Sequence, residues 1–511
     1  MRKIKKLVAF TLSIIMMLSL AAPAFAEEVV VPEYPTIYVT GAKTNNIYLD
    51  GEKVFPKDAD EMQIIKDALA PCFEKLAKGL VTGNYDEYVE EFYNAMAPMF
   101  EGATLDKNGL PSNGSSPEYH SSTVEVSDKQ SDYGIWDFRF WYDWRLSPVT
   151  IAEEMKDYID RVIAKTGKDK VQLVGRCLGA NMIAAYLHYY KDHAAHYVSD
   201  VSYFSSSALG IDYMSAIYTG NFVLEPEAID NFLEYFMESE DLIEDSETSV
   251  LILTMVEFFK QIKLLGITGE ALVKLVDQFK GELIPKIVRE TLGSWPSYWA
   301  MVTEECYEDA RDFIYKDLKD EYAGMIEKLD EYHYNVQKNL IKDMNDLKVA
   351  GVNFCIFAKY GFPEIPVYEG ATAQSDSSTT LYRQSFGARS AAYGKILDEQ
   401  YINTAKDKKY ISADKVVDAS TCLFPETTWF VRDLHHDHFG QLEGMSMEIM
   451  RYDLDGDSEK YPRFLCIKDG GLAPVDFKEE NVKEEESIFA SAIRFFTALI
   501  NFIVKLLNKQ Q

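Results

Sequence analysis

Short apolar runs alternate with amphipathic stretches along much of this chain. Runs rich in β-branched and aromatic residues are typical of strands, and apolar residues at helical spacing are typical of helices. Strands are predicted at residues 35–40, 134–141, 171–174, 352–358 and 427–432, the last taken as the final strand, and helices at residues 59–100, 151–166 and 181–190. Strands alternating with helices predict an α/β fold with a mostly parallel sheet flanked by helices.

The pattern changes between residues 208 and 348. Only helical stretches are predicted there, at residues 228–237, 250–265, 269–280 and 306–347. Because a buried strand resumes at residue 352, we expect a core formed by residues 27–207 and 349–470, with a helical cap inserted at residues 208–348. Such a cap can exclude water from a site and shape a pocket for an acyl chain.

Both ends of the chain carry segments outside this core. Residues 1–26 combine a basic start, an apolar run and an Ala-Phe-Ala ending, which predicts a cleaved signal peptide and a secreted or cell-surface protein. A charged linker is predicted at residues 471–486, followed by an apolar helix at residues 487–511 with one polar face. That helix must bury most of its surface, by docking on protein, by self-association or at a membrane interface.

The net charge of the chain limits the kinds of partner that it can bind. The formal net charge is −30, and loss of a leader with four basic residues leaves −34. A chain this acidic would repel nucleic acid and anionic bilayers, which favours protein contacts for the terminal helix. The six cysteines are too sparse over 511 residues for a disulfide framework, and the sequence leaves any pairing open.

One short motif carries the strongest chemical signal. The sequence Gly175-Arg176-Cys177-Leu178-Gly179 follows a predicted buried strand and precedes a predicted helix. In a nucleophile elbow, Gly175 and Gly179 allow a sharp turn that exposes the central side chain. The amide after the nucleophile, here that of Leu178, can bind an oxyanion. The motif therefore predicts an elbow with a thiol in place of the usual hydroxyl.

A thiol nucleophile needs a histidine to handle its proton and an acid to orient that histidine. Asp376 lies about twenty residues past the strand predicted at residues 352–358, and His436 lies just past the strand at residues 427–432. The order Cys177, Asp376, His436 is the nucleophile, acid, base order of α/β-hydrolases. These three residues are the predicted catalytic triad.

Alternatives exist for both partners. His435 or His438 could serve as the base, and Asp418 and Glu426 also fall near the predicted rim of the sheet. The neighbouring histidines could instead hold a metal, but a zinc site needs three or four converging ligands, which adjacent positions do not supply. We therefore expect neither a metal nor a cofactor.

Three islands of sequence resemble a known family. Tyr142-Asp143-Trp144-Arg145 lies about thirty residues before the elbow, and Trp295-Pro296-Ser297-Tyr298-Trp299 follows it within the predicted cap. Together with the elbow these segments resemble the lecithin:cholesterol acyltransferase family and related bacterial lipases of the α/β-hydrolase fold. The islands span residues 35–440, and most of the cap matches nothing in that family.

The resemblance implies roles for further residues. The turn Gly41-Ala42 would supply the second oxyanion donor through the Ala42 amide, and Arg145 would tie loops together. The family nucleophile is serine and Cys177 departs from it, so the resemblance supports the fold more than the activity. Dienelactone hydrolases have a similar Gly-x-Cys-x-Gly-Gly elbow in the same fold, and a thiol ionises more readily than a hydroxyl.

These observations predict a secreted acyl-ester hydrolase or O-acyltransferase, lipase- or esterase-like, that acts on a small-molecule or lipid ester through an acyl-enzyme on Cys177. A catalytically inactive surface or binding protein that keeps the hydrolase scaffold is the main alternative. Hydrolysis of an amide or peptide by the same thiolate is a third hypothesis for the function.

Overall fold

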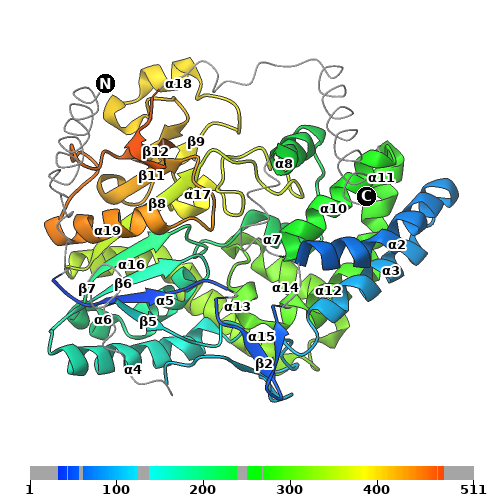
Figure 1. Cartoon of the computed structure of the whole chain (residues 1–511), viewed down its shortest axis with the longest axis horizontal. Helices are drawn as coiled ribbons and strands as arrows, with labels where there is room; N and C mark the ends of the chain where they lie inside the picture. Colours follow the sequence, from blue (N-terminus) through cyan, green and yellow to red (C-terminus); the bar gives the residue numbers. More distant parts are fainter. Residues whose placement is uncertain are drawn as a thin grey trace, which may run out of the picture.

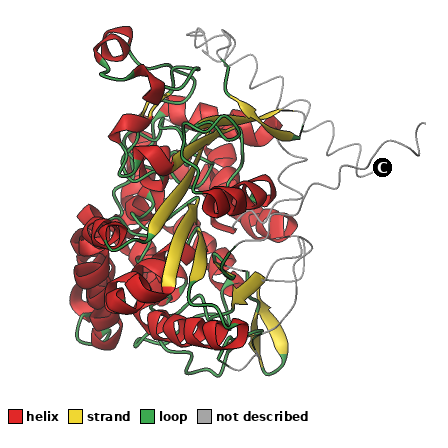
Figure 2. Ribbon diagram, turned by 90° about the vertical axis from the view of Figure 1, so that its left-hand side faces the viewer, coloured by secondary structure: helices red, strands yellow, loops and turns green. Residues whose placement is uncertain are grey.

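An eight-stranded sheet forms the centre of the molecule in the computed structural model (Figure 2). The structure describes residues 33–42, 44–56, 61–122, 126, 137–238, 250–267, 269–468 and 470–476. The predicted signal peptide, the C-terminal helix and most of the charged linker lie outside the described residues.

The sheet has the strand order β13-β12-β11-β8-β7-β6-β1-β5. Neighbouring strands pair in parallel except for β12 with β13, which are antiparallel. The strands are β1 (Thr36–Val39), β5 (Asp137–Phe140), β6 (Val171–Arg176), β7 (Val198–Phe204), β8 (Asn353–Tyr360), β11 (Thr428–Arg432), β12 (Phe464–Lys468) and β13 (Gly471–Pro474). With helices on both faces, this sheet confirms the predicted α/β fold.

Two parts of the sheet differ from the prediction. The strand at residues 427–432 is not the last one, because β12 and β13 continue the sheet beyond it. The sheet therefore extends past residue 470 into the range predicted as a charged linker. β7 was not predicted, because its sequence VSDVSYF mixes polar with apolar residues, yet every position of it is buried.

Apolar side chains along the central strands alternate between the two faces of the sheet, where they join separate apolar cores, as a period of two requires. On β1, Ile37 and Val39 belong to the larger core and Tyr38 to the smaller one. Helices α4 (Pro148–Thr166) and α5 (Gly179–Tyr189) bury their apolar faces in the larger core. Helix α19 (Gly440–Tyr452) covers the opposite face of the sheet (Figure 1).

The chain between β7 and β8 is helical wherever it is described, with no strand in residues 208–238, 250–267 or 269–348. Its helices are α7 (Asp212–Thr219), α8 (Pro226–Glu238), α10 (Val250–Leu264), α11 (Gly269–Gln278), α12 (Ile284–Glu290), α13 (Pro296–Trp299), α14 (Tyr307–Tyr315), α15 (Ala323–Glu331) and α16 (Leu340–Val349). The single helix predicted at residues 306–347 is wrong. Lys316 ends α14 with a φ of 33°, and a π-helical turn at Tyr332–Val336 separates α15 from α16.

An N-terminal helical hairpin adds to this insertion. Helices α2 (Glu61–Thr82) and α3 (Asp86–Met96) pack beside α10 and α11, away from the sheet (Figure 1). Gln278 of α11 accepts a hydrogen bond from the Tyr85 amide at 2.6 Å. A small antiparallel sheet of β2 (Ile47–Leu49), β3 (Glu52–Phe55) and β4 (Ser116–Pro117) lies at the edge of the core. None of the helices in the described part of the chain has the length and apolarity needed to cross a membrane.

Candidate active site

Cys177 occupies a strained turn between β6 and α5. Its φ is +47°, a left-handed conformation that non-glycine residues adopt rarely and mostly at functional sites. The flanking glycines are required by packing. A Cβ at Gly179 would lie 2.1 Å from the Val39 carbonyl oxygen, and one at Gly175 would lie 2.8 Å from Ile183 Cδ1. The local structure therefore has the strand-turn-helix geometry predicted for a nucleophile elbow, with the sulfur of Cys177 at its apex.

The structure brings the three predicted triad residues together. His436 follows β11, and its Nδ1 lies 2.8 Å from Oδ2 of Asp376, which lies in the loop after β8. The backbone amide of His436 also donates to the Asp376 carbonyl oxygen at 2.9 Å. The same imidazole makes a side-chain hydrogen bond with Cys177. His436 thus bridges the thiol and the carboxylate, both of which come from distant parts of the chain.

The charges of this triad reinforce one another. Burial alone would lower the pKa of His436, but the charges of Asp376 and Cys177 raise it well above its ordinary value. Burial of Asp376 is likewise outweighed by His436 and Lys359, which lower the pKa of that carboxyl to about 2. Oδ1 of Asp376 accepts two further hydrogen bonds, from the amides of Ser378 and Thr379. An imidazolium next to a fixed carboxylate is the form this geometry favours at neutral pH.

The alternative candidates for the base and for the acid make other contacts or are exposed. His435 Nε2 bonds to the Ser377 hydroxyl at 2.5 Å, and burial lowers the pKa of His435 to about 4. His438 is exposed, Glu426 is exposed, and Asp418 accepts hydrogen bonds from Ser420 and Tyr401. Within the described residues no group of three or more His, Cys, Asp or Glu side chains could hold a metal ion. The six cysteines are all free thiols in the structure.

A buried lysine that was not predicted from the sequence anchors the backbone of the loop that carries His436. Lys359 lies near the end of β8 with 0% exposure. Its Nζ donates to the carbonyl oxygens of His435 (3.0 Å), His436 (2.8 Å) and His438 (2.8 Å). Burial lowers the pKa of this lysine to about 7, against the opposing charges of Asp376 and Asp437. The only sequence signal was a cation at the end of an apolar strand.

Replacing Lys359 by methionine is expected to lower kcat about 10- to 100-fold with little change in KM, because the loop of His436 loses its three anchoring hydrogen bonds. Since the wild-type ammonium deprotonates near pH 7, kcat should decline as the pH rises through about 7, and the variant should lack this step. Steady-state kinetics between pH 5 and 9 measure both effects. Lys348→Met, an exposed lysine, is the control. A rise in KM by the same factor as the fall in kcat would show that Lys359 does not position the base.

The turn Gly41-Ala42 lies next to the thiol. A Cβ at Gly41 would lie 3.2 Å from Cys177 Cβ and 3.9 Å from its Sγ. The Tyr142 hydroxyl donates to the Thr40 carbonyl oxygen at 2.5 Å, and the Thr44 hydroxyl donates to that of Gly41 at 2.9 Å. Leu178 is the N-cap residue of α5, so its amide lies at the N-terminus of that helix.

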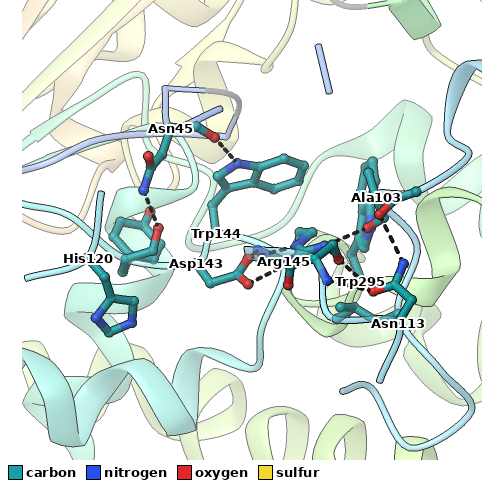
Figure 3. Close-up of polar contacts among 12 residues, drawn as sticks. Asn45, Ala103, Asn113, His120, Asp143, Trp144, Arg145 and Trp295 are labelled. Atoms are coloured by element: carbon teal, nitrogen blue, oxygen red, sulfur yellow. Dashed lines mark hydrogen bonds and ion pairs between the residues drawn. The ribbon is translucent and has the colours of Figure 1, made fainter. Parts of the chain in front are cut away.

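Arg145 ties together the loops behind this turn (Figure 3). It is fully buried and forms a two-point ion pair with Asp143, at 2.9 and 2.6 Å. It also donates to the Ala103 carbonyl oxygen at 3.0 Å and to the Ser115 hydroxyl at 2.8 Å. Trp295, from the second family-like island, donates to the same Ala103 oxygen at 2.9 Å. Arg145 therefore has the contacts of a structural residue.

Replacing Arg145 by methionine is expected to lower the free energy of unfolding by about 3–5 kcal/mol, because it leaves the Asp143 carboxylate buried without its cation. Denaturant unfolding of the purified protein measures this loss. Arg139→Met, at an exposed position of β5, should change stability by less than about 1 kcal/mol. A similar loss of unfolding free energy in both variants would mean that the buried Arg145–Asp143 ion pair stabilises the fold no more than an exposed arginine does.

Comparison with solved structures gives weak likenesses. The crystal structure of the Tle4-Tli4 complex aligns with a TM-score of 0.24 and 10% sequence identity, over 64% of this chain and 75% of that chain. No protein-family model matches the chain, and no curated protein does. A likeness this low carries no argument, so the fold assignment rests on the sheet itself. The resemblance to the lecithin:cholesterol acyltransferase family stays a prediction.

Proposed function

We propose that this protein is a secreted acyl-ester hydrolase or O-acyltransferase that works through a thioester on Cys177. One observation carries the proposal: His436 bridges the thiol of Cys177 and the carboxylate of Asp376 at the carboxyl end of a parallel sheet. The order of these residues along the chain is that of α/β-hydrolases. Secretion is expected from the signal peptide predicted at residues 1–26.

The reaction would begin from the paired thiolate and imidazolium. The thiolate of Cys177 attacks the ester carbonyl, and the amides of Ala42 and Leu178 stabilise the oxyanion. His436 then gives its proton to the departing alcohol, and the acyl group stays on sulfur as a thioester. Water or an acceptor alcohol loses a proton to His436 and attacks the thioester, which releases the acid or a new ester and restores the thiolate.

The helical insertion bears on the acyl portion of the substrate. Helix α8 lies near the base, because Tyr235 stacks on His435 with ring centroids 6.4 Å apart. Helices that lie over an elbow can shield an acyl-enzyme from water and line a channel for its chain. An apolar acyl chain is therefore the proposed donor group, as in the lipases that the sequence resembles.

Hydrolysis of p-nitrophenyl esters with acyl chains of two to sixteen carbons tests the proposal, using purified protein without residues 1–26. We expect turnover with a preferred chain length, and inactivation by iodoacetamide that added substrate slows. Adding an alcohol separates the two activities, because a transferase forms a new ester in proportion to the alcohol. An absence of turnover at every chain length, with no protection of the thiol by any ester, would instead favour an inactive scaffold used for binding.

A further inference from the structure

Two side-chain oxygen atoms in the loop after β8 are buried without a hydrogen-bond partner among the described residues. Glu364 has 0% exposure, and its Oε1 accepts a hydrogen bond from the Ile365 amide at 2.8 Å. Its Oε2 is buried and makes no hydrogen bond with any described residue. The hydroxyl of Tyr368, four residues further along the chain, is also buried and makes no hydrogen bond with any described residue. Each unpaired buried group costs about 1–3 kcal/mol, so their presence in one loop calls for an explanation.

These groups lie beside the proposed active site. Glu364 is close enough to Asp212, Asp376 and His436 for their charges to act on its carboxyl group. The charge of Glu364 in turn acts on the hydroxyl of Tyr368. Besides burial, the charges of Glu364 and Cys177 both raise the pKa of Tyr213, which lies on α7. The loop carrying Glu364 and Tyr368 therefore faces the same region as the thiol.

Glu364 differs from its two acidic neighbours, because no cation among the described residues forms an ion pair with it. Asp212 pairs with Arg383 at 2.8 Å, and Asp376 pairs with His436. Burial raises the pKa of Glu364 well above its ordinary value, and the negative charges of Asp212 and Asp376 raise it further. A neutral carboxylic acid offers one O–H donor and acceptor oxygens, and a phenol offers the same combination.

We propose that Glu364 and Tyr368 form a polar subsite that binds the hydroxyl groups of the substrate's alcohol portion, so that the preferred substrate is a polyol monoester. The inference rests on the proposed function and specifies its substrate class. A hydroxyl group can donate to one of these side chains and accept from the other, which pairs both orphaned atoms. An ammonium group would instead require Glu364 to ionise beside two carboxylates in a buried site.

The test compares a glycerol monoester with the methyl ester of the same acyl chain. For the wild type we expect the ratio of the two kcat/KM values, glycerol over methyl, to be at least 10. Glu364→Leu should lower this ratio about 10-fold or more, and Tyr368→Phe about 5-fold, because each removes a hydrogen bond to the bound alcohol. Glu364→Gln should keep most of the preference, since an amide also donates and accepts.

Matched variants and stability measurements control the test. Glu369→Gln and Tyr382→Phe alter exposed residues of the same segment and should leave the ratio unchanged. Tyr368→Phe should melt no lower than the wild type, because it removes an unpaired buried hydroxyl. At position 364 the melting temperature is compared for Glu364→Gln, which keeps an acceptor for the Ile365 amide. A purely structural role would lower the melting temperature and leave the ratio alone.

The outcomes separate this inference from the proposed function. Hydrolysis of the methyl ester without any preference for the glycerol ester overturns the subsite and leaves the proposed function intact. Absence of turnover with both esters overturns the proposed function. A preference for an aminoethyl ester that Glu364→Gln abolishes would show that the subsite binds a cation, which also overturns the inference.

Discussion

Replacing Cys177 by alanine is expected to lower kcat/KM for ester hydrolysis by about 10⁴-fold or more. Alanine removes the nucleophile and leaves only the oxyanion donors and substrate binding to act on the ester. The elbow should keep its fold, because alanine accepts the positive φ of this position no worse than cysteine does, and the packing of Gly175 and Gly179 is untouched. Initial rates with p-nitrophenyl butanoate measure the effect.

Two further variants define what the alanine result means. Cys466→Ala changes a free thiol on β12, far along the sheet from the elbow, and should retain full activity. Cys177→Ser keeps a nucleophile in place and should retain more activity than Cys177→Ala, although its hydroxyl depends fully on His436 for deprotonation. An alanine variant as active as the wild type would remove Cys177 from the mechanism.

Replacing Asp376 by asparagine is expected to lower kcat by about 10³- to 10⁴-fold with a small change in KM. The carboxylate accepts from His436 Nδ1, which fixes the orientation of the ring and stabilises its positive charge. Because Asp376 raises the pKa of His436, its loss should move the alkaline limb of the kcat/KM profile to lower pH. In the wild type the imidazolium persists above neutral pH, so this limb lies above the step near pH 7 expected from Lys359.

Rates measured between pH 5 and 10 test both parts of this prediction. Asp320→Asn, at an exposed position of the helical insertion, is the matched control. It should leave the alkaline limb in place. An alkaline limb in Asp376→Asn identical to that of the wild type would show that Asp376 does not act on the base.

The elbow could be predicted from sequence because its determinants are local. A buried strand, two glycines and a helix within eleven residues leave few other conformations, and the structure shows that neither glycine tolerates a Cβ. Asp376 and His436 could be proposed because each follows a strand, and parallel strands bring their carboxyl ends to one edge of the sheet. His436 was preferred, but the sequence could not exclude His435, because adjacent residues follow the same strand and differ only in the direction of their side chains.

Other features depend on packing between distant segments. Lys359 matters because three carbonyl groups more than seventy residues away converge on its Nζ, which no local pattern encodes. Glu364 could be recognised only from the structure, in which none of the described residues forms a hydrogen bond with its Oε2. Strands β12 and β13 were missed because they are short and only partly buried, so their alternation of apolar and polar residues is weak.

The central claim is that the acyl group passes through sulfur on Cys177, and trapping the intermediate tests it most directly. The wild type is mixed with excess p-nitrophenyl butanoate, quenched in acid within the first turnovers and weighed by intact-protein mass spectrometry, followed by peptide mapping. We predict the addition of one butanoyl group on the peptide containing Cys177, cleaved by neutral hydroxylamine as a thioester and absent from Cys177→Ala. Steady turnover with the butanoyl group on another residue, or on none, would contradict the account.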